Sequence, residues 1–327
     1  MSGSGAFSHA PVMRDRIIDL LAPAVAAAAD PVVIDATVGL GGHTEHLLAT
    51  YPDLIVIGID RDPAALELAG RRLAPFGDRF VPFRSVFDDI DGALATVGAG
   101  SAAGIVFDLG VSSMQLDSDE RGFAYSRTTH LDMRMDPAGQ VTAEDVVNDY
   151  SAKELARVFQ QYGEERFARR IATLIVQRRQ DARITTTTQL ADICEAAVPM
   201  PARRKGHPAK RVFQALRIEV NDELGALHAG LVNGVRALRP AGRVAVLAYH
   251  SLEDRIVKQT FASAAAPPVP RGMPVIPQDA QPFLTLITRG AEKPDDAEVS
   301  DNPRAGSARL RVAELVRPVP SHWQGVA

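Results

Sequence analysis

Hydrophobic and polar positions follow two alternating patterns along the first hundred residues. Short runs of apolar, largely β-branched residues indicate buried strands at 32–34, 54–59, 80–83 and 104–107. Between them, Asp62 and Pro63 begin a helix as its cap and first residue, and Val86–Leu94 has the spacing of a short helix. This alternation predicts a parallel sheet with helices on both faces, and ligands at the carboxyl ends of the strands.

A different pattern fills the middle of the chain. Between about residues 140 and 235 there is no strand signal, only helix starts such as the capping box Ser151–Glu154. The sheet resumes at Arg243–Ala248. We therefore predict an α/β domain interrupted by an all-helical domain, with a first part at 1–135, the insertion at 136–218 and a second part at 219–316.

The C-terminal segment is less regular. A proline-rich stretch, Ala266–Pro282, precedes two expected edge strands at 283–288 and 308–312. The last residues, 317–327, are expected to form a disordered tail.

A glycine-rich turn follows the first strand, which ends in Asp35. The turn and the start of the next helix hold Gly39, Gly41, Gly42 and His43. Such a turn lets a ligand approach the backbone closely. The second strand ends in Asp60, 21 residues beyond Gly39, where a carboxylate can accept both hydroxyls of a ribose. Thr44 replaces the last glycine of a dinucleotide fingerprint, and no triphosphate-binding loop is present. The unit resembles the class I fold that binds S-adenosylmethionine (SAM), a Rossmann-like fold; a simple tight turn is the alternative.

Composition places the chain among globular proteins. It is 46% hydrophobic and 23% charged, without an apolar run of about 18 residues that would span a bilayer and without a secretion signal. The single cysteine, Cys194, excludes a disulfide framework, and no residues have metal-ligand spacing. We expect a cytoplasmic protein that has no metal site and no membrane segment.

The net charge of −4 is unevenly distributed. Residues 150–218 contain 14 Lys or Arg and 6 Asp or Glu, a net charge of +8, and 196–218 contain no acid. This asymmetry is typical of a phosphate-binding face, although a solvated helix surface is the simpler alternative. The candidate substrate-binding residues are Arg203, Arg204, Lys205, Lys210 and Arg211.

Asp108 ends the fourth strand and is the first candidate for chemistry. Methylation of an exocyclic amine commonly uses an acid or amide, two prolines and an aromatic residue at this place. The side chain accepts an amine hydrogen and aims the nitrogen lone pair at the methyl group. Asp108 fits the first position, but both prolines and the aromatic residue are missing. A polar strand cap and a ligand-positioning residue remain alternatives.

A second polar cluster follows the strand that ends at Ala248. It contains His250, a candidate base, although a helix start capped by Ser251 is the plainer interpretation. Methylation at C5 of a pyrimidine would need a thiolate, and Cys194 lies mid-helix among apolar residues, which favours core packing. His43 and His207 are assigned binding or structural roles.

Eight motifs in order resemble the MraW (RsmH) family, bacterial enzymes that methylate N4 of a cytidine in the 16S ribosomal RNA of the small subunit. The motifs lie at His9–Met13, Gly39–His43, Ile59–Asp62, Asp108–Gln115, Glu120–Phe123, Leu131–Asp136, Tyr162–Arg166 and His250–Arg255. The resemblance runs from about residue 9 to 315 and departs only at 302–308. It implies a Rossmann-like methyltransferase with a helical insertion, and a substrate in the decoding region. It also implies SAM contacts at Gly41–His43, Asp60, Phe87, Asp108 and Gln115.

Two other classes of protein compete with this interpretation. An enzyme that methylates a small molecule would not need the basic insertion, and an RNA-binding protein without activity would not need Asp60, Asp108 and Gln115 together. The sequence leaves the oligomeric state open, a homodimer included.

Overall fold

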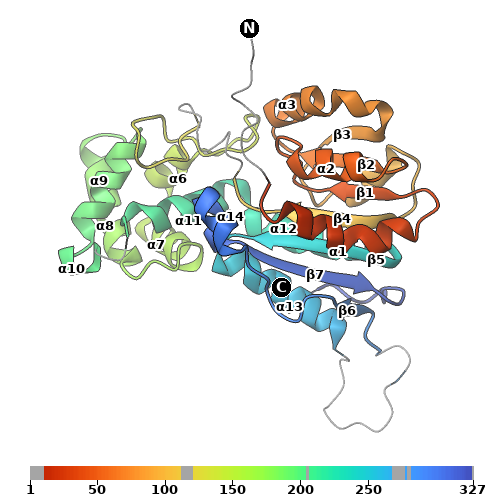
Figure 1. Cartoon of the computed structure of the whole chain (residues 1–327). Coiled ribbons are helices and arrows are strands. Elements are labelled where there is room, and N and C mark those ends of the chain that lie inside the picture. Colours follow the sequence, from red (N-terminus) through yellow and green to blue (C-terminus); the bar gives the residue numbers. More distant parts are fainter. Residues whose placement is uncertain (1–10, 112–120, 204–205, 267–276, 278–280, 326–327) are drawn as a thin grey trace. The chain divides into compact units, whose positions relative to one another are not determined.

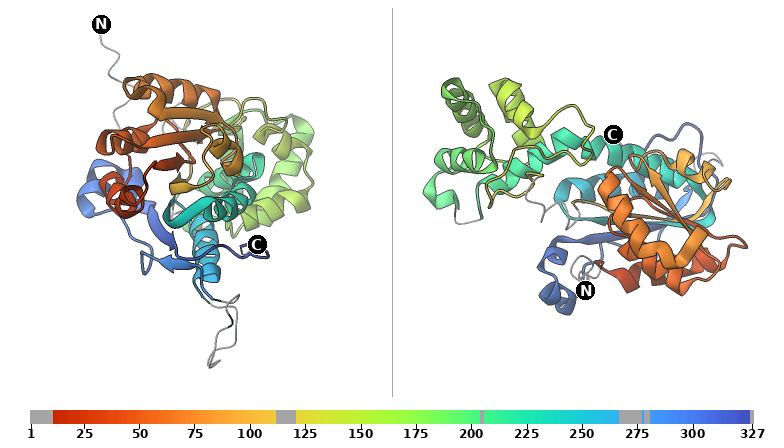
Figure 2. Two further views of the ribbon diagram at one scale, coloured as in Figure 1. Left: turned by 90° about the vertical axis from the view of Figure 1, so that its right-hand side faces the viewer. Right: turned by 90° about the horizontal axis from the view of Figure 1, so that it is seen from above.

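The computed structural model describes residues 11–111, 121–203, 206–266, 277 and 281–325. The chain divides into two compact units. One consists of 1–110 with 224–327 and is called the sheet unit; the other, 111–223, is called the helical unit. Each is described by itself, and Figures 1 and 2 show their elements.

A seven-stranded sheet forms the centre of the sheet unit, in the order β3-β2-β1-β4-β5-β7-β6 (Figure 1). Its strands are β1 Val32–Asp35, β2 Ile55–Asp60, β3 Phe80–Arg84, β4 Ala102–Asp108, β5 Leu238–Ala248, β6 Leu284–Leu286 and β7 Arg309–Leu315. Strands β1 to β5 are parallel, which confirms the predicted parallel sheet, and β7 is antiparallel to both β5 and β6.

The prediction of an edge strand at 308–312 is wrong. β7 lies inside the sheet, because Arg309–Glu314 pair with Ala248–Arg243 on one side and Ala313–Leu315 pair with β6 on the other. Val312 and Ala313 are fully buried, on opposite faces. A short apolar run does not reveal whether one or both of its edges will be paired.

Helices cover both faces of this sheet. In the sheet unit they are α1 Arg14–Ala26, α2 Gly42–Thr50, α3 Pro63–Leu73, α4 Ile90–Ala95, α12 Glu223–Ala237, α13 Ser251–Ala265 and α14 Asp296–Asp301, with 3₁₀ turns at Ala74–Arg79 and Pro303–Ser307. Successive strand residues point to opposite faces, so Val33 joins one hydrophobic core and Ile34 the other. Strands β1, β2 and β4 are therefore continuously apolar up to their terminal aspartates and do not alternate with polar residues.

Part of the segment for which a disordered tail is predicted, up to residue 325, contacts the sheet unit through Trp323. Trp323 is 8% exposed and meets Phe283 edge to face, with ring centroids 5.1 Å apart. Its indole Nε1 donates to Ser263 Oγ at 3.2 Å, and Arg236 donates to its carbonyl oxygen. A single large aromatic side chain thus anchors a segment whose composition predicts disorder.

The helical unit holds α6 Ala143–Asp149, α7 Ala152–Gln161, α8 Ala168–Asp181, α9 Thr187–Ala197, α10 Met200–Arg203 and α11 Ala209–Asn221. Capping boxes begin α6 at Thr142, α7 at Ser151 and α9 at Thr186, which confirms the capping box predicted at Ser151–Glu154. Cys194 is buried in the common core with Phe159 and Leu216, as expected, and burial raises the pKa of its thiol.

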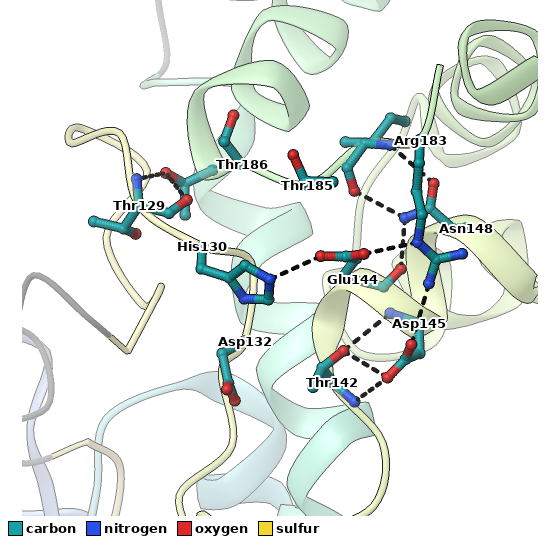
Figure 3. Close-up of polar contacts among 12 residues, drawn as sticks. Thr129, His130, Asp132, Thr142, Glu144, Asp145, Asn148, Arg183, Thr185 and Thr186 are labelled. Atoms are coloured by element: carbon teal, nitrogen blue, oxygen red, sulfur yellow. Dashed lines mark hydrogen bonds and ion pairs between the residues drawn. The ribbon is translucent and has the colours of Figure 1, made fainter. Parts of the chain in front are cut away.

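The segment before α6 belongs to the helical unit, so the first boundary lies at 111 and not at the expected 136. The second lies at 223, whereas 218 was expected. Leu131 and Met133 are fully buried in the helical core. His130 Nε2 lies 3.0 Å from Glu144 Oε2, and Arg183 forms ion pairs with Glu144 and Asp145 (Figure 3). Arg183 also forms an ion pair with Asp149. Leu131, Met133 and His130 do not lie in a helix, so their contacts leave no periodic hydrophobic pattern in the sequence.

No helix in the described part of the chain is both long and apolar enough to cross a membrane.

Candidate active site

Three carboxylates stand at the ends of neighbouring parallel strands in the sheet unit. Asp35 ends β1, Asp60 ends β2 and Asp108 ends β4, and β1 lies between the other two strands. Carboxyl ends of parallel strands meet at one edge of a sheet, which is where ligands of open α/β sheets bind.

The glycine turn connects β1 to α2. Gly39 has φ +50° and Gly41 has φ +77°, conformations that side chains disfavour. A Cβ atom on Gly41 would lie 2.9 Å from Leu73 Cδ1, and one on Gly42 would lie 2.5 Å from Pro11 Cγ. On Gly39 it would meet only the Thr37 carbonyl oxygen, at 3.8 Å. Packing thus explains Gly42, whereas Gly39 leaves room for a ligand near the backbone.

Asp60 connects the second strand to this turn. Its Oδ2 accepts a hydrogen bond from the Gly39 backbone N–H at 3.0 Å, and its Oδ1 accepts one from the Asp62 N–H at 2.9 Å. Burial raises the pKa of Asp60 to about 6 although both hydrogen bonds lower it. Each carboxylate oxygen retains a further lone pair, so Asp60 can still accept two hydroxyls of a ribose.

A buried polar network lies next to the turn. Asp35 is 1% exposed and its Oδ2 accepts from the Thr44 hydroxyl at 2.7 Å, while its Oδ1 accepts from the Thr37 N–H at 3.3 Å. Burial raises the pKa of Asp35. Thr37 Oγ1 in turn accepts from the Asp108 N–H at 2.6 Å, so the turn after β1 is fixed to the end of β4.

Asp108 is held on both carboxylate oxygens. Its Oδ1 accepts from the Tyr249 hydroxyl at 2.7 Å, and its Oδ2 lies 3.4 Å from Nε2 of the buried His43. Burial lowers the pKa of His43, but the Asp108 and Asp35 carboxylates outweigh it and raise this pKa above its ordinary value. Burial and the adjacent Asp108 raise the pKa of Tyr249, so its phenol stays protonated and donates. Sequence reasoning missed Tyr249, which follows β5.

His250 caps the helix that follows Tyr249. Its Nδ1 accepts from the Glu253 N–H at 3.4 Å, and Glu253 Oε2 accepts from the His250 N–H at 3.1 Å, which together form a capping box for α13. His250 Nε2 lies 3.1 Å from Glu253 Oε1. These contacts match the alternative of a helix cap, with His250 itself as the capping residue in place of Ser251.

Phe87 follows β3 and is half-buried. Its ring meets Phe107 edge to face at 5.8 Å, and the Arg61 guanidinium carbon lies 6.0 Å from the ring centre. Arg61 directly follows Asp60, the last residue of β2. The Phe87 ring therefore supplies an apolar surface near the end of β2. Gln115, the remaining expected cofactor contact, lies outside the described residues.

The candidate substrate-binding residues lie in the helical unit. Arg203 donates to the carbonyl oxygens of Val198 at 2.9 Å and of Glu195, so its guanidinium fixes the end of α9. Arg211 donates to the Glu164 carbonyl at 3.0 Å, and Lys210 is exposed on α11. Arg204 and Lys205 lie outside the described residues.

The sheet order, the glycine turn and the two acids Asp60 and Asp108 fit the nucleoside and amino-acid parts of SAM. Gly39 offers open backbone, Asp60 offers free acceptor positions, and Phe87 offers an apolar wall. Together they define a Rossmann-like methyltransferase.

Comparison with known proteins gives the family. The model of the MraW methylase family matches residues 6–316. "Ribosomal RNA small subunit methyltransferase H" of Kocuria rhizophila is 54% identical over 94% of this chain and 94% of its own length. The protein of that name from Mycolicibacterium smegmatis is 52% identical over 94% of this chain and 84% of its own. The chain belongs to the MraW methylase family, and its methyl donor is SAM.

Among solved structures, an rRNA methylase from Streptococcus thermophilus aligns with 92% of this chain and 95% of its own at 12% identity, with a TM-score of 0.39. The family membership therefore rests on the sequence matches.

Proposed function

We propose that this protein transfers a methyl group from SAM to the exocyclic N4 of a cytidine in 16S ribosomal RNA. The target would lie in the decoding region of the small ribosomal subunit, and the protein would act in the cytoplasm. The names of its relatives support the ribosomal substrate. Asp108 is the observation that supports an amine as the methyl acceptor. It is a carboxylate held in one orientation at the end of β4.

The proposed role of Asp108 is to orient the amine of the target base. The Tyr249 hydroxyl occupies one lone pair of Oδ1, which leaves acceptor positions on both oxygens for an amine N–H. Accepting that hydrogen aims the nitrogen lone pair, which is otherwise delocalised into the ring, at the methyl carbon. SAM supplies an electrophilic methyl group when bound.

The proton that the amine loses needs no strong base, because the methylated amine is a cation that releases a proton readily to water. His250 is the candidate acceptor from the sequence, and its Nδ1 already accepts from the Glu253 N–H. We therefore propose that its main role is to begin α13 behind Tyr249, with a proton acceptor as the second candidate role.

The target base must leave its stack to reach a carboxylate at a strand end. We expect the basic helical unit to bind the surrounding RNA. From the sequence, the candidate RNA-binding segment is 203–211. Its candidate contacts are Arg203, Arg204, Lys205, Lys210 and Arg211.

The test is a nucleoside analysis of small-subunit RNA from cells with and without the gene. Loss of N4-methylcytidine with retention of C5-methylcytidine is the expected result. Persistence of N4-methylcytidine at its original amount would refute the proposal. A second assay follows the transfer of labelled methyl groups. Transfer to extracted RNA, but not to small molecules of the cell extract, distinguishes an RNA methyltransferase from a small-molecule methyltransferase. SAM binding without any transfer would indicate an inactive RNA-binding protein.

A further inference from the structure

The exposed side of α7 and α8 contains two adjoining hollows. One has a volume of about 600 Å³ and lies between the two helices, and the other has about 550 Å³ and follows α8 towards α9. Arg169 and Thr173 line both hollows, so the two are parts of one groove, here called the α8 groove. The basic stretch 150–218 includes these residues, but the candidate contacts from the sequence lie at 203–211.

Cations dominate the lining of the α8 groove. They are Lys153, Arg157, Arg169, Arg170 and Arg178, and the polar remainder is three glutamines and a threonine. Of the described residues that line the groove, none is an aspartate or a glutamate. All five cations are exposed.

Four of these cations have no charged partner in the described structure. Arg157 forms an ion pair with Glu219 at 3.1 Å, but for Lys153, Arg169, Arg170 and Arg178 the described residues provide no ion pair and no side-chain hydrogen bond. Other arginines of the helical unit do form ion pairs, as Arg183 does with three acids and Arg134 with Asp132. Unpaired like charges repel one another, so their concentration on one face has a cost unless a ligand neutralises them.

The arrangement suits a linear polyanion better than a single anion. Arg169 and Arg178 are nine residues apart on one helix, about 13 Å at the usual rise per residue. Guanidinium groups bind phosphate oxygens with two hydrogen bonds, and the glutamine amides and the hydroxyl can contact sugars or bases. An isolated phosphate would contact only a part of this groove.

We propose that the α8 groove binds the phosphodiester backbone of the RNA substrate, with Lys153, Arg169, Arg170 and Arg178 as its phosphate contacts. This inference rests on the proposed RNA substrate. It moves the main RNA contact away from residue 203, whose guanidinium is engaged by carbonyl oxygens of its own unit.

The test uses the full-length protein with Arg169→Gln, Arg170→Gln and Arg178→Gln together. Glutamine is a good helix former and removes charge without reversing it. The matched control is Lys258→Gln, Arg289→Gln and Lys293→Gln, three exposed cations of the sheet unit for which the described residues provide no ion pair and no side-chain hydrogen bond. Binding is measured to extracted small-subunit RNA and to intact small subunits over a range of salt concentrations, with SAM affinity as the check on folding.

We expect the groove variant to bind extracted RNA at least tenfold more weakly than wild type. The slope of log affinity against log salt should fall by about 2, since each lost contact to single-stranded RNA removes about 0.7. The control variant should change neither the affinity nor the slope by a comparable amount, and SAM affinity should be unchanged in both.

Three outcomes would overturn the inference. If the groove variant keeps the wild-type affinity and slope while wild type binds and methylates RNA, the groove is not the contact but the proposed function stands. If only binding to intact subunits weakens, the groove contacts a ribosomal protein. If the control variant weakens binding equally, the effect is one of net charge. Failure of the wild-type protein to bind or methylate RNA would instead refute the proposed function itself.

Discussion

Replacing Tyr249 by phenylalanine tests how Asp108 works. The change removes one hydroxyl and with it the 2.7 Å hydrogen bond to Asp108 Oδ1. A hydrogen bond to a charged group contributes about 1.5–3 kcal/mol. If the orientation of the Asp108 carboxylate acts in the transition state, this loss should lower turnover by roughly ten- to a hundredfold, because about 1.4 kcal/mol corresponds to a factor of ten in rate.

The assay separates turnover from cofactor binding. Methyl transfer to RNA gives kcat at saturating SAM, and calorimetry gives SAM affinity, which should change by less than about threefold. Tyr51→Phe is the matched control, because its hydroxyl has no hydrogen-bond partner among the described residues and its loss should leave both quantities unchanged. A kcat within twofold of wild type would refute the positioning role of Tyr249, and an equal loss of SAM affinity would assign Asp108 to the cofactor site.

Three further predictions concern the cofactor site and the C-terminal segment. Asp60→Ala should weaken SAM binding about a hundredfold or more by calorimetry, since two charge-assisted hydrogen bonds are lost; an affinity within threefold of wild type would defeat the ribose assignment. Because the pKa of Asp60 is raised to about 6 and ribose hydroxyls favour its ionised form, SAM affinity should rise with pH up to about 6 and level off above it. Binding titrations from pH 5 to 8 check this, and a profile identical in Asp60→Asn would contradict it. Trp323→Ala should lower the free energy of unfolding by about 3 kcal/mol in urea titrations, whereas the exposed His322→Ala should change it by less than about 0.5 kcal/mol; equal effects would show that the Trp323 contacts do not stabilise the fold.

Local sequence patterns predicted the first five strands and the glycine turn. The apolar runs of β1, β2 and β4 are short and continuous because both faces of the sheet are covered there. The positive φ of Gly41 is set by the turn that this residue forms with its immediate neighbours. Such features depend on nearby residues, and a sequence pattern records them directly.

Contacts between distant segments could not be predicted in the same way. Tyr249 reaches Asp108 across 141 residues, and this requires that Asp108 pair with Leu247 in the β4–β5 register. Before that register is known, His250 is the more noticeable residue, since histidine is the commoner base. Trp323 similarly depends on Phe283 and Ser263, which lie in other elements.

The position of β7 has a consequence for the order in which the protein forms during translation. β7 emerges from the ribosome after every other strand of the sheet, yet it supplies the whole second edge of β5 over Arg243–Ala248. The helical unit, in contrast, is one continuous stretch that is complete by residue 223. Domains fold as units during synthesis, and pairings between distant segments form slowly. The helical unit can therefore become protease-resistant on the ribosome while the nascent sheet still presents an open edge.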